Sequence, residues 1–408
     1  MVLLLPIIIF ILLFIPYLYV FPANDGSLEF VFAHRWFTGD NILQLLSLHP
    51  PFKLILNSIY FSLFGYDTTN YIGLLFGSIG IAALYFIAKK LFNEKVALLS
   101  SILLAISGLY LSVALFSIHD FLMTVFILLA FVYYLNSRYI LYALFACIAV
   151  LTKETAVFFA LSILLSDIFI KKHRSFWTFA PIVILFWYIE FIHFAGYHLW
   201  NDWNFSPTAS KGSIYTMINN LVTLKIFNKY AYENWLHLFI FNFNWVYWLF
   251  AIGSFFYIKT AELKKSIAPI GIFFVIFMLT VLSFQTFTIN RYILPLLPFL
   301  YLFASFGVSK LKWQPASISL LIIISLVSLA QSIDPISNFI WQKTQLLDES
   351  VYINHTLDGD DGITYNLQYL DLMKTRTDMI LNNNCNFPEL IKTDTQTLSL
   401  LHVSNCNK

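Results

Sequence analysis

The chain is poor in charged residues, which make up 11% of its 408 residues. Soluble globular domains carry about 25% charged residues, so this shortage excludes an ordinary water-soluble enzyme and a disordered chain. The few charges nearly balance, with 24 Lys and Arg against 22 Asp and Glu, and this balance gives no electrostatic reason to expect a nucleic acid as partner. Apolar residues make up 59% of the chain, and the composition therefore predicts a polytopic membrane protein.

Cysteine is also scarce, with three in the chain. Cys147 lies within an apolar run and is interpreted as a small packing residue. Cys385 and Cys406 lie near the C-terminus, and a disulfide between them is an open alternative if the tail lies outside the cytoplasm. No His and Cys spacing typical of zinc and no Gly-rich phosphate loop occurs, which argues against a soluble nucleotide-binding fold.

Long apolar runs make up much of the chain. A helix that crosses the hydrocarbon core needs about 20 mostly apolar residues, and runs of this kind predict about 11 membrane spans. They cover residues 2–22, 70–91, 95–117, 121–136, 139–152, 154–170, 176–197, 239–258, 266–287, 292–309 and 314–332. A further apolar stretch, 50–64, is interpreted as a re-entrant or interfacial helix. The first run lacks the features of a cleavable signal peptide, so we expect it to be an anchor.

Basic residues in alternate loops predict the orientation of these spans. One set of loops contains Lys89, Lys90, Lys95, Arg138, Lys171, Lys172, Arg174, Lys259, Lys264, Lys265, Lys310 and Lys312, against the acids Glu94 and Glu262. Short cytoplasmic loops are enriched in Lys and Arg, so this side is expected to face the cytoplasm. We therefore expect an integral, multi-pass protein of the cell membrane with a cytoplasmic N-terminus and an extracytoplasmic C-terminus.

Three segments on the predicted outer side are long, namely 23–69, 198–238 and 333–408. We divide the chain into a membrane domain, 1–332, and a polar extracytoplasmic segment, 333–408, which is too short to bury much of a core alone. The expected fold is all-α, a bundle of membrane helices with outer juxtamembrane helices. Asn204-Phe205-Ser206 and Asn354-His355-Thr356 match the N-glycosylation pattern on that outer side.

Ionisable residues gather at the outer ends of the predicted spans. They are Asp25, Glu29, His49, His119-Asp120, Lys153-Glu154 and Arg291-Tyr292. Charges at membrane depth are costly and usually face a cavity or a partner. Any one of them can be a solvated span end, but acids, bases and histidines at one leaflet together predict a polar site. Asp167, near a cytoplasmic end, is interpreted as a solvated end residue.

Six short motifs follow one another along the chain. They are Asn24-Asp25-Gly26, His49-Pro50-Pro51-Phe52-Lys53, Leu91-Phe92 after Lys89-Lys90, Ser117-Ile118-His119-Asp120-Phe121, Leu151-Thr152-Lys153-Glu154 and Arg291-Tyr292-Ile293-Leu294-Pro295-Leu296-Leu297-Pro298. Their order and spacing resemble the polytopic glycosyltransferases that use a lipid-phosphate sugar donor, such as the protein O-mannosyltransferases and the lipid A aminoarabinose transferases. The resemblance covers roughly residues 1–310 and implies a GT-C fold.

The resemblance implies roles for the acidic residues. Asp25 resembles the catalytic acidic residue, which acts as general base on the acceptor hydroxyl, and Asp120 matches a second acidic position that holds the acceptor or a metal. The family has an acidic pair in its first outer loop, whereas this chain has Asn24 as the first member. Glu29, one helical turn after Asp25, is therefore an alternative base.

The resemblance also implies contacts with the donor phosphate. The candidate residues are His49, Lys153, Arg291 and Tyr292, with His119 and Glu154 in supporting places. His49 stands where one branch of the family has a phosphate-binding Lys. The family often has an Arg just before its second span, where this chain has Asn70-Tyr71, so Arg35 is an alternative source of that contact.

The implied reaction moves a hexose-type sugar from a polyprenyl (dolichyl) phosphate to an extracytoplasmic protein, lipid or glycan acceptor. Carboxylates suit the deprotonation of an acceptor hydroxyl, and cationic side chains suit the departing phosphate. A direct attack inverts the anomeric centre. No cofactor is assigned, and a divalent cation held by Asp25 and Asp120 stays open.

Three other classes of protein stay open at this point. The first is a transporter or flippase for lipid-linked glycans, although transporters place charges near the midplane, whereas here they lie at one surface. The second is a ligase or polymerase of surface polysaccharide, which typically has a large outer loop late in the chain. The third is an inactive relative that serves as an assembly subunit, which Asn24 keeps open.

Overall fold

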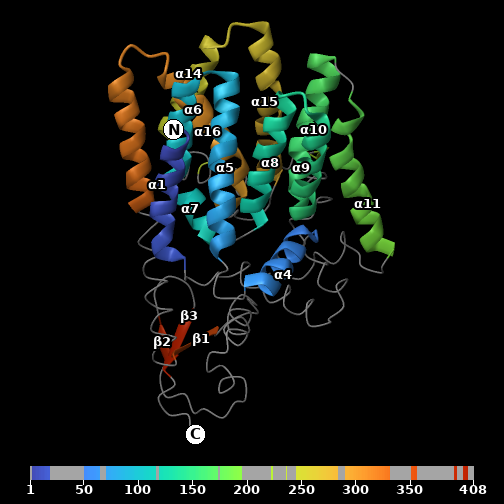
Figure 1. The fold of residues 1–408 in the computed structure, drawn as a ribbon, viewed down its shortest axis with the longest axis vertical. Coiled ribbons are helices and arrows are strands. Elements are labelled where there is room, and N and C mark those ends of the chain that lie inside the picture. The colour runs from blue at the N-terminus through green and yellow to red at the C-terminus, as the bar shows by residue number, and fades with distance from the viewer. Residues whose placement is uncertain are drawn as a thin grey trace.

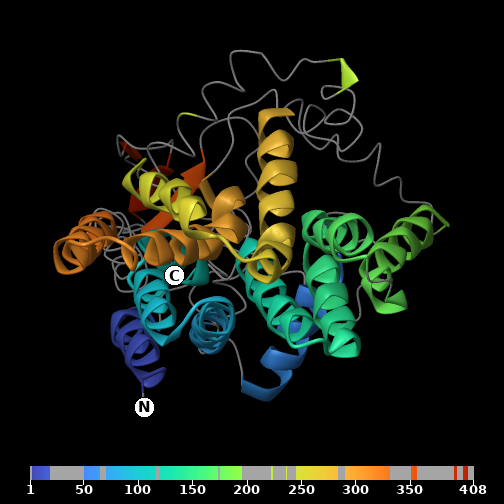
Figure 2. The ribbon, with the colours of Figure 1, turned by 90° about the horizontal axis from the view of Figure 1, so that it is seen from above.

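The computed structural model describes residues 2–18, 50–64, 70–115, 119–172, 175–194, 222–223, 236, 245–283, 290–330, 351–355, 390–392 and 398–402. These residues are mainly helical, and the long helices stand side by side in an upright bundle (Figure 1). Viewed along the bundle, the helices of residues 119–194 lie on one side and those of residues 297–330 on the other, with the helix that starts at Ala261 between them (Figure 2).

The helices of the first half begin with α1 (Leu4–Phe14), which continues into a 3₁₀ turn, Ile15–Tyr17. They continue with α4 (Phe52–Phe64), α5 (Asn70–Leu91), α6 (Glu94–Ala105), α7 (Gly108–Leu115), α8 (His119–Leu135) and α9 (Tyr139–Thr152). A 3₁₀ turn, Glu154–Ala156, leads into α10 (Val157–Leu165), a π-helical segment, Ser166–Lys171, a 3₁₀ turn, Phe176–Thr178, and α11 (Ala180–Phe194).

The second half continues the bundle. It contains α14 (Trp245–Ser254) with the 3₁₀ turn Phe255–Tyr257, α15 (Ala261–Ser283), the 3₁₀ segment Asn290–Leu296, α16 (Leu297–Val308) and a last helix, Gln314–Ala330. These bounds agree closely with the apolar runs, because an apolar run of this length satisfies its backbone hydrogen bonds most easily as a helix.

Two helices of the described chain are long and apolar enough to cross a membrane, namely α5 and residues Ala261–Thr280 of α15. The pair α6 and α7 makes a third if it is counted as one span, although the two helices are bent by 55°. The other apolar helices in this part of the chain have 10–17 residues. The number of about 11 spans therefore remains a prediction.

The bend between α6 and α7 corrects the expectation of one continuous helix over 95–117. The side-chain hydroxyl of Ser107 accepts the backbone N–H of Tyr110 at 3.3 Å. This is the contact of a helix N-cap, in which a Ser side chain replaces the main-chain acceptor and starts a new helix. Gly108 follows as the first residue of α7. A polar Ser-Gly pair therefore interrupts the run, although its mean hydropathy is that of a single span.

Aromatic rings hold the two halves of the bundle together. Phe131 of α8 lies with its ring centroid 5.8 Å from that of Phe159 of α10 and 5.8 Å from that of Phe299 of α16. Phe273 of α15 completes the group at 5.4 Å from Phe159. All four side chains are buried. Edge-to-face aromatic contacts of this kind add about 0.5–1.5 kcal/mol each beyond the burial of their area.

The structure corrects the interpretation of Asp167 as a solvated end residue. Asp167 lies in the π-helical segment after α10, is 1% exposed and accepts a short hydrogen bond from the hydroxyl of Tyr134. The ammonium of Lys171 lies 4.1 Å from the centroid of the Tyr134 ring. The wider turn of a π-helix therefore accompanies a buried polar contact between α8 and the end of α10, which span length alone did not indicate.

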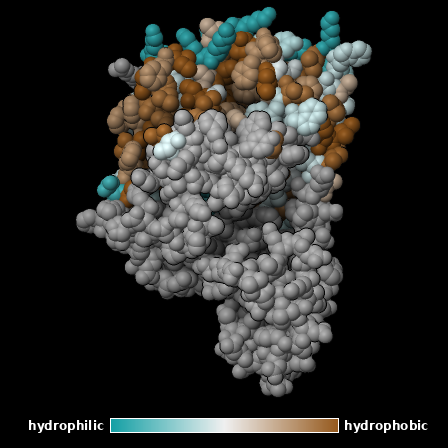
Figure 3. Space-filling model, turned by 180° about the vertical axis from the view of Figure 1, so that it is seen from behind, coloured by the Kyte–Doolittle hydropathy of each residue, from teal (hydrophilic) through white to brown (hydrophobic). Residues whose placement is uncertain are grey.

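The surface of the bundle is apolar on its sides and charged at one end. Figure 3 shows hydrophobic residues over the flank of the described helices and hydrophilic ones gathered at one end. Exposed apolar side chains on the flank include Phe86, Leu144, Phe186 and Val275. Exposed Lys residues, such as Lys89, Lys90, Lys264 and Lys310, lie where α5 ends, α15 begins and α16 ends. This distribution suits a helix bundle in a bilayer.

Among the residues that the structure describes, those of the C-terminal segment depart from the predicted all-α fold. Strands β1 (Val351–His355), β2 (Leu390–Lys392) and β3 (Leu398–His402) form an antiparallel sheet in the order β1-β3-β2. The register pairs Val351 with His402 and Leu390 with Leu401. Val351-Tyr352-Ile353 has the β-branched and aromatic residues that favour strands, a signal too short to stand out in a polar segment.

Candidate functional site

Two helix ends bring the central residues of the site together. α8 begins at His119, so Asp120 lies in its first turn, where the N-terminal end of the helix dipole favours a carboxylate. α9 packs against α8 and ends at Thr152. Lys153 then has an extended backbone, with φ −153° and ψ 129°, before the turn Glu154–Ala156 begins. The start of α8 and the end of α9 therefore lie at the same end of the bundle.

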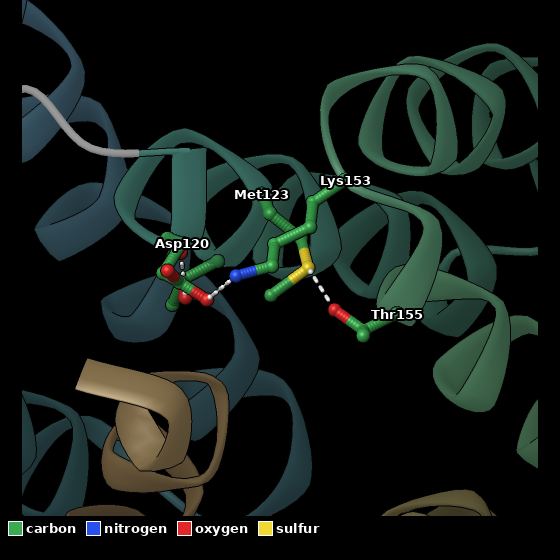
Figure 4. Close-up of polar contacts among 5 residues, drawn as sticks. Asp120, Met123, Lys153 and Thr155 are labelled. Carbon is green, nitrogen blue, oxygen red and sulfur yellow. Dashed lines mark hydrogen bonds and ion pairs between the residues drawn. The ribbon is translucent and has the colours of Figure 1, made fainter. Parts of the chain in front are cut away.

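Asp120 and Lys153 form a buried ion pair at this place (Figure 4). The Nζ of Lys153 donates to Oδ1 of Asp120 at 2.7 Å, and the two side chains are 7% and 2% exposed. Removing two charges from water costs several kcal/mol each, which the attraction offsets only when the geometry is good. The ion pair is thus weak evidence that these residues stabilise the fold. It is better evidence for a functional site that requires charged side chains.

Tyr292 brings a third motif to the ion pair. The Nζ of Lys153 lies 4.7 Å from the centroid of the Tyr292 ring, a distance typical of a cation–π contact. Tyr292 belongs to the 3₁₀ segment Asn290–Leu296, which packs against α8. Arg291 belongs to the same segment, but its side chain is not described. Three motifs far apart in sequence therefore meet at one ammonium group.

Smaller contacts hold the two sides of the ion pair in place. The hydroxyl of Thr124 donates to the main-chain carbonyl of Asp120 at 2.7 Å and fixes the first turn of α8. The hydroxyl of Thr155 donates to Sδ of Met123 at 3.3 Å (Figure 4). This contact links α8 to the segment after Lys153. The contacts beside the ion pair thus involve α8 and the segment after α9, the same two elements that the ion pair joins.

The other predicted site residues divide into two groups. His119 is buried at 6% exposure beside Asp120, and Glu154 is half-buried beside Lys153. Asp25, Glu29 and His49, together with the alternative contact Arg35, lie outside the described residues. Their place relative to the ion pair stays a prediction.

The described residues do not make a metal centre. No group of three or more His, Cys, Asp and Glu side chains that could hold an ion occurs among residues that the structure describes. Oδ1 of Asp120 is engaged by the Lys153 ammonium, and a cation so close competes with a divalent metal for the same carboxylate. No step of the reaction is therefore assigned to a metal.

Sequence reasoning assigned no structural role to three polar residues at this end of the bundle. The amide of Asn70 donates to the main-chain carbonyl of Tyr17 at 3.0 Å, so it joins the start of α5 to the end of the first helix. Lys53 and Asn57 of α4 are both 0% exposed. Their i, i+4 spacing within an apolar run was the available signal, because it puts both on one helix face.

Comparison with known proteins gives one family match. Residues 48–200 match the family model of the dolichyl-phosphate-mannose-protein mannosyltransferases. This segment contains His49, Asp120 and Lys153. No curated protein sequence matches the chain.

Solved structures share the fold over nearly the whole chain. ArnT from Cupriavidus metallidurans, solved with undecaprenyl phosphate bound, has a TM-score of 0.55 at 14% identity, over 93% of this chain and 70% of ArnT. The oligosaccharyltransferase of Archaeoglobus fulgidus, in its apo form, has a TM-score of 0.52 at 12% identity, over 96% of this chain and 61% of its own length. The same archaeal protein, AglB, solved with an inhibitory peptide and a dolichol-phosphate, has a TM-score of 0.51 at 13% identity, with the same coverage.

These matches bear on the resemblance that the motifs indicate. The family match lies on the segment that carries the central motifs, and the fold match extends over both halves of the bundle. The chain has the GT-C glycosyltransferase fold, and its resemblance to the polytopic glycosyltransferases with lipid-phosphate donors is confirmed.

Proposed function

We propose that the protein is a membrane glycosyltransferase that moves a hexose-type sugar from a polyprenyl (dolichyl) phosphate to an extracytoplasmic acceptor. The observation that carries the proposal is the contact of Lys153 with both Asp120 and Tyr292, since it joins three of the motifs on which the resemblance rests. ArnT is solved with undecaprenyl phosphate and AglB with dolichol-phosphate and a peptide. Two proteins of this fold therefore bind a polyprenyl or dolichol phosphate, which supports a lipid phosphate as the carrier of the proposed donor sugar.

The proposed reaction is a single displacement. The acceptor hydroxyl gives its proton to the Asp25 carboxylate as its oxygen forms a bond to the anomeric carbon. The bond from that carbon to the phosphate oxygen breaks, and the polyprenyl phosphate leaves with the electron pair. Attack from the face opposite the leaving group inverts the anomeric centre. Alignment of the acceptor is the main task of the protein, since the leaving group is already good.

The cationic residues have the complementary task. Negative charge grows on the departing phosphate, and cations that are already in place stabilise it without reorganisation. Lys153 is such a cation, because Asp120 and Tyr292 hold its ammonium at one position. His49, Arg291 and Tyr292 complete the proposed phosphate site, with His119 and Glu154 in support. Asp120 keeps Lys153 in place, and its second proposed task is to orient the acceptor.

The proposed site lies at the extracytoplasmic face of the cell membrane. The exposed lysines gather at the opposite end of the bundle from Asp120, as the positive-inside rule requires of a cytoplasmic end. The lipid tail of the donor can stay in the bilayer while its sugar meets water at this face. The N-terminus is then cytoplasmic, and segment 333–408 forms a separate extracytoplasmic part.

A transfer assay tests the proposal. Membranes that contain the protein are supplied with a radiolabelled polyprenyl-phosphate hexose, and label that reaches protein, lipid or glycan acceptors is counted. We expect Asp25→Asn to lower the rate by about 10²–10⁴-fold, the usual contribution of a general base, and Asp120→Asn to abolish most transfer. Asp202→Asn, the same change in another predicted outer loop, is the matched control. Full transfer by both Asp25→Asn and Asp120→Asn would show that the assignment is wrong.

A further inference from the structure

Helix α4 buries three polar residues and exposes several large apolar ones. Lys53 and Asn57 are 0% exposed and Ser58 is 5% exposed, whereas Ile59, Leu63 and Phe64 are 53%, 68% and 63% exposed. A helix on a soluble protein shows the opposite arrangement. Apolar residues that face outward suit contact with lipid, and polar residues that face inward need partners of their own.

This inward face lies at the end of the bundle that contains the ion pair. The ring of Phe52, in the first turn of α4, meets the ring of Phe126 of α8 edge-on, with centroids 5.3 Å apart. α4 also packs against α9, whose last residue precedes Lys153. In Figure 1, α4 lies obliquely across the ends of α8 and α9.

Asn57 lies on this inward face with a side-chain amide whose hydrogen-bonding groups are unsatisfied among the described residues. Neither its amide nitrogen nor its amide oxygen has a hydrogen-bond partner in the described structure, although the side chain is completely buried. The neighbouring Ser58, also buried, donates to the carbonyl of Leu54 at 2.8 Å. Buried polar groups without partners are rare and need an explanation, because such a group loses its hydrogen bonds to water and gains nothing.

We infer that Asn57 binds a hydroxyl group of a substrate of the proposed glycosyl transfer. An amide has both a donor and an acceptor, and a hydroxyl can satisfy both, whereas a phosphate offers only acceptors. Lys53, one turn before Asn57 on the same helix face, is completely buried as well. The inference rests on the proposed function and makes Asn57 a substrate-binding residue. The hydroxyl belongs either to the donor sugar or to the acceptor.

The first experiment measures stability without substrate. Thermal unfolding of the purified protein in detergent is compared for wild type, Asn57→Leu and Ser58→Ala. Leu has the same branched skeleton of heavy atoms as Asn and no polar atoms, so removal of the unpartnered amide should leave the melting temperature unchanged or raise it. If Asn57 had a structural role, Asn57→Leu would lower the melting temperature, and this result would overturn the inference.

The second experiment identifies the source of the hydroxyl. The rise in melting temperature caused by a polyprenyl-phosphate hexose is compared with that caused by polyprenyl phosphate alone, and label transfer is measured in parallel. We expect Asn57→Leu to lose about tenfold or more of the transfer efficiency, the effect of one missing hydrogen bond of about 1.4 kcal/mol. If the donor sugar is the partner, the variant also loses the extra protection given by the hexose. If the acceptor is the partner, both lipids protect the variant as they protect wild type.

The outcomes separate this inference from the proposed function. No transfer by wild type, with no protection by either lipid, would contradict the proposed function itself. Transfer by wild type together with equal transfer by Asn57→Leu would overturn only the role of Asn57. Ser58→Ala should transfer label as wild type does, since its hydroxyl is already satisfied within α4.

Discussion

The ammonium of Lys153 and the carboxylate of Asp120 lie 2.7 Å apart, although 33 positions separate them in the sequence. Each stands at a helix end, Asp120 in the first turn of α8 and Lys153 directly after α9. The ion pair is nearly closed to solvent. A single substitution of either residue can therefore lower both the stability of the fold and the rate of a reaction.

A double-mutant cycle separates these two effects. Lys153→Met or Asp120→Asn alone leaves a buried charge without its partner, which we expect to cost about 3–5 kcal/mol of stability. The combination of both changes should cost clearly less than the sum of the two, because no charge is then left alone. Thermal or denaturant unfolding of the four proteins in detergent gives the coupling. Additive costs would mean that the pair does not exist in solution.

The contact of Tyr292 with Lys153 predicts a difference between two substitutions. Tyr292→Phe keeps the ring that faces the ammonium, whereas Tyr292→Leu removes it. We expect Tyr292→Leu to lose about 0.5–2 kcal/mol of interaction with the cation, seen as weaker protection by polyprenyl phosphate in thermal unfolding. Tyr292→Phe serves as the control that keeps the ring. Equal losses in both variants would assign the effect to the hydroxyl instead.

Two glycines of the α14 and α16 pair should respond to alanine in opposite ways. A Cβ at Gly307 would lie 2.2 Å from the carbonyl oxygen of Phe250, so α16 and α14 would have to move apart. Such overpacking costs about 1–3 kcal/mol. A Cβ at Gly253 of α14 meets nothing within 4 Å, and alanine there should be neutral or stabilise by about 0.5–1 kcal/mol. Melting temperatures of Gly307→Ala and Gly253→Ala test the helix contact, which equal values would contradict.

The buried contact between Tyr134 and Asp167 predicts an effect of one hydroxyl on stability. Tyr134→Phe keeps the ring beneath Lys171 but removes the donor to the buried carboxylate. We expect a loss of about 1–3 kcal/mol, the cost of a removed hydrogen-bond partner for a buried group. Tyr133→Phe, the same change at the neighbouring and less buried residue, is the control. A melting temperature equal to that of the control would contradict the contact.

The helices could be predicted from apolar runs with small errors at their ends. The run 70–91 is α5, and the run 139–152 is α9. The break at Ser107 could not be predicted from hydropathy, because a single hydroxyl that caps a new helix does not change the average. The strand Val351–His355 was missed because its partner, residues 398–402, lies far away in the sequence, so local patterns do not indicate the pairing.

The approach of Asp120 to Lys153 was predictable in outline, because alternating spans bring every second loop to one side of a membrane. The sequence did not predict which charges pair. Pairing depends on the extended backbone at Lys153 and on the packing of residues 290–296 against α8. The burial of Asn57 was not foreseen either. One Asn barely changes the mean hydropathy of an apolar run, and the mean does not show whether its side chain faces inward. The fold shows that it does.

The last prediction concerns the orientation of the bundle in the membrane. This orientation determines whether the proposed site can bind an extracytoplasmic acceptor. In a chain with all three cysteines changed to serine, a single cysteine is introduced by Lys90→Cys or by Ser206→Cys. Lys90 is exposed at the basic end of α5, so its substitute should react with a membrane-impermeant maleimide only after the cells are permeabilised. The cysteine at 206, in a predicted outer loop, should react in intact cells. The reverse pattern would put Asp120 and Lys153 at the cytoplasmic face, where a donor sugar presented outside could not reach them.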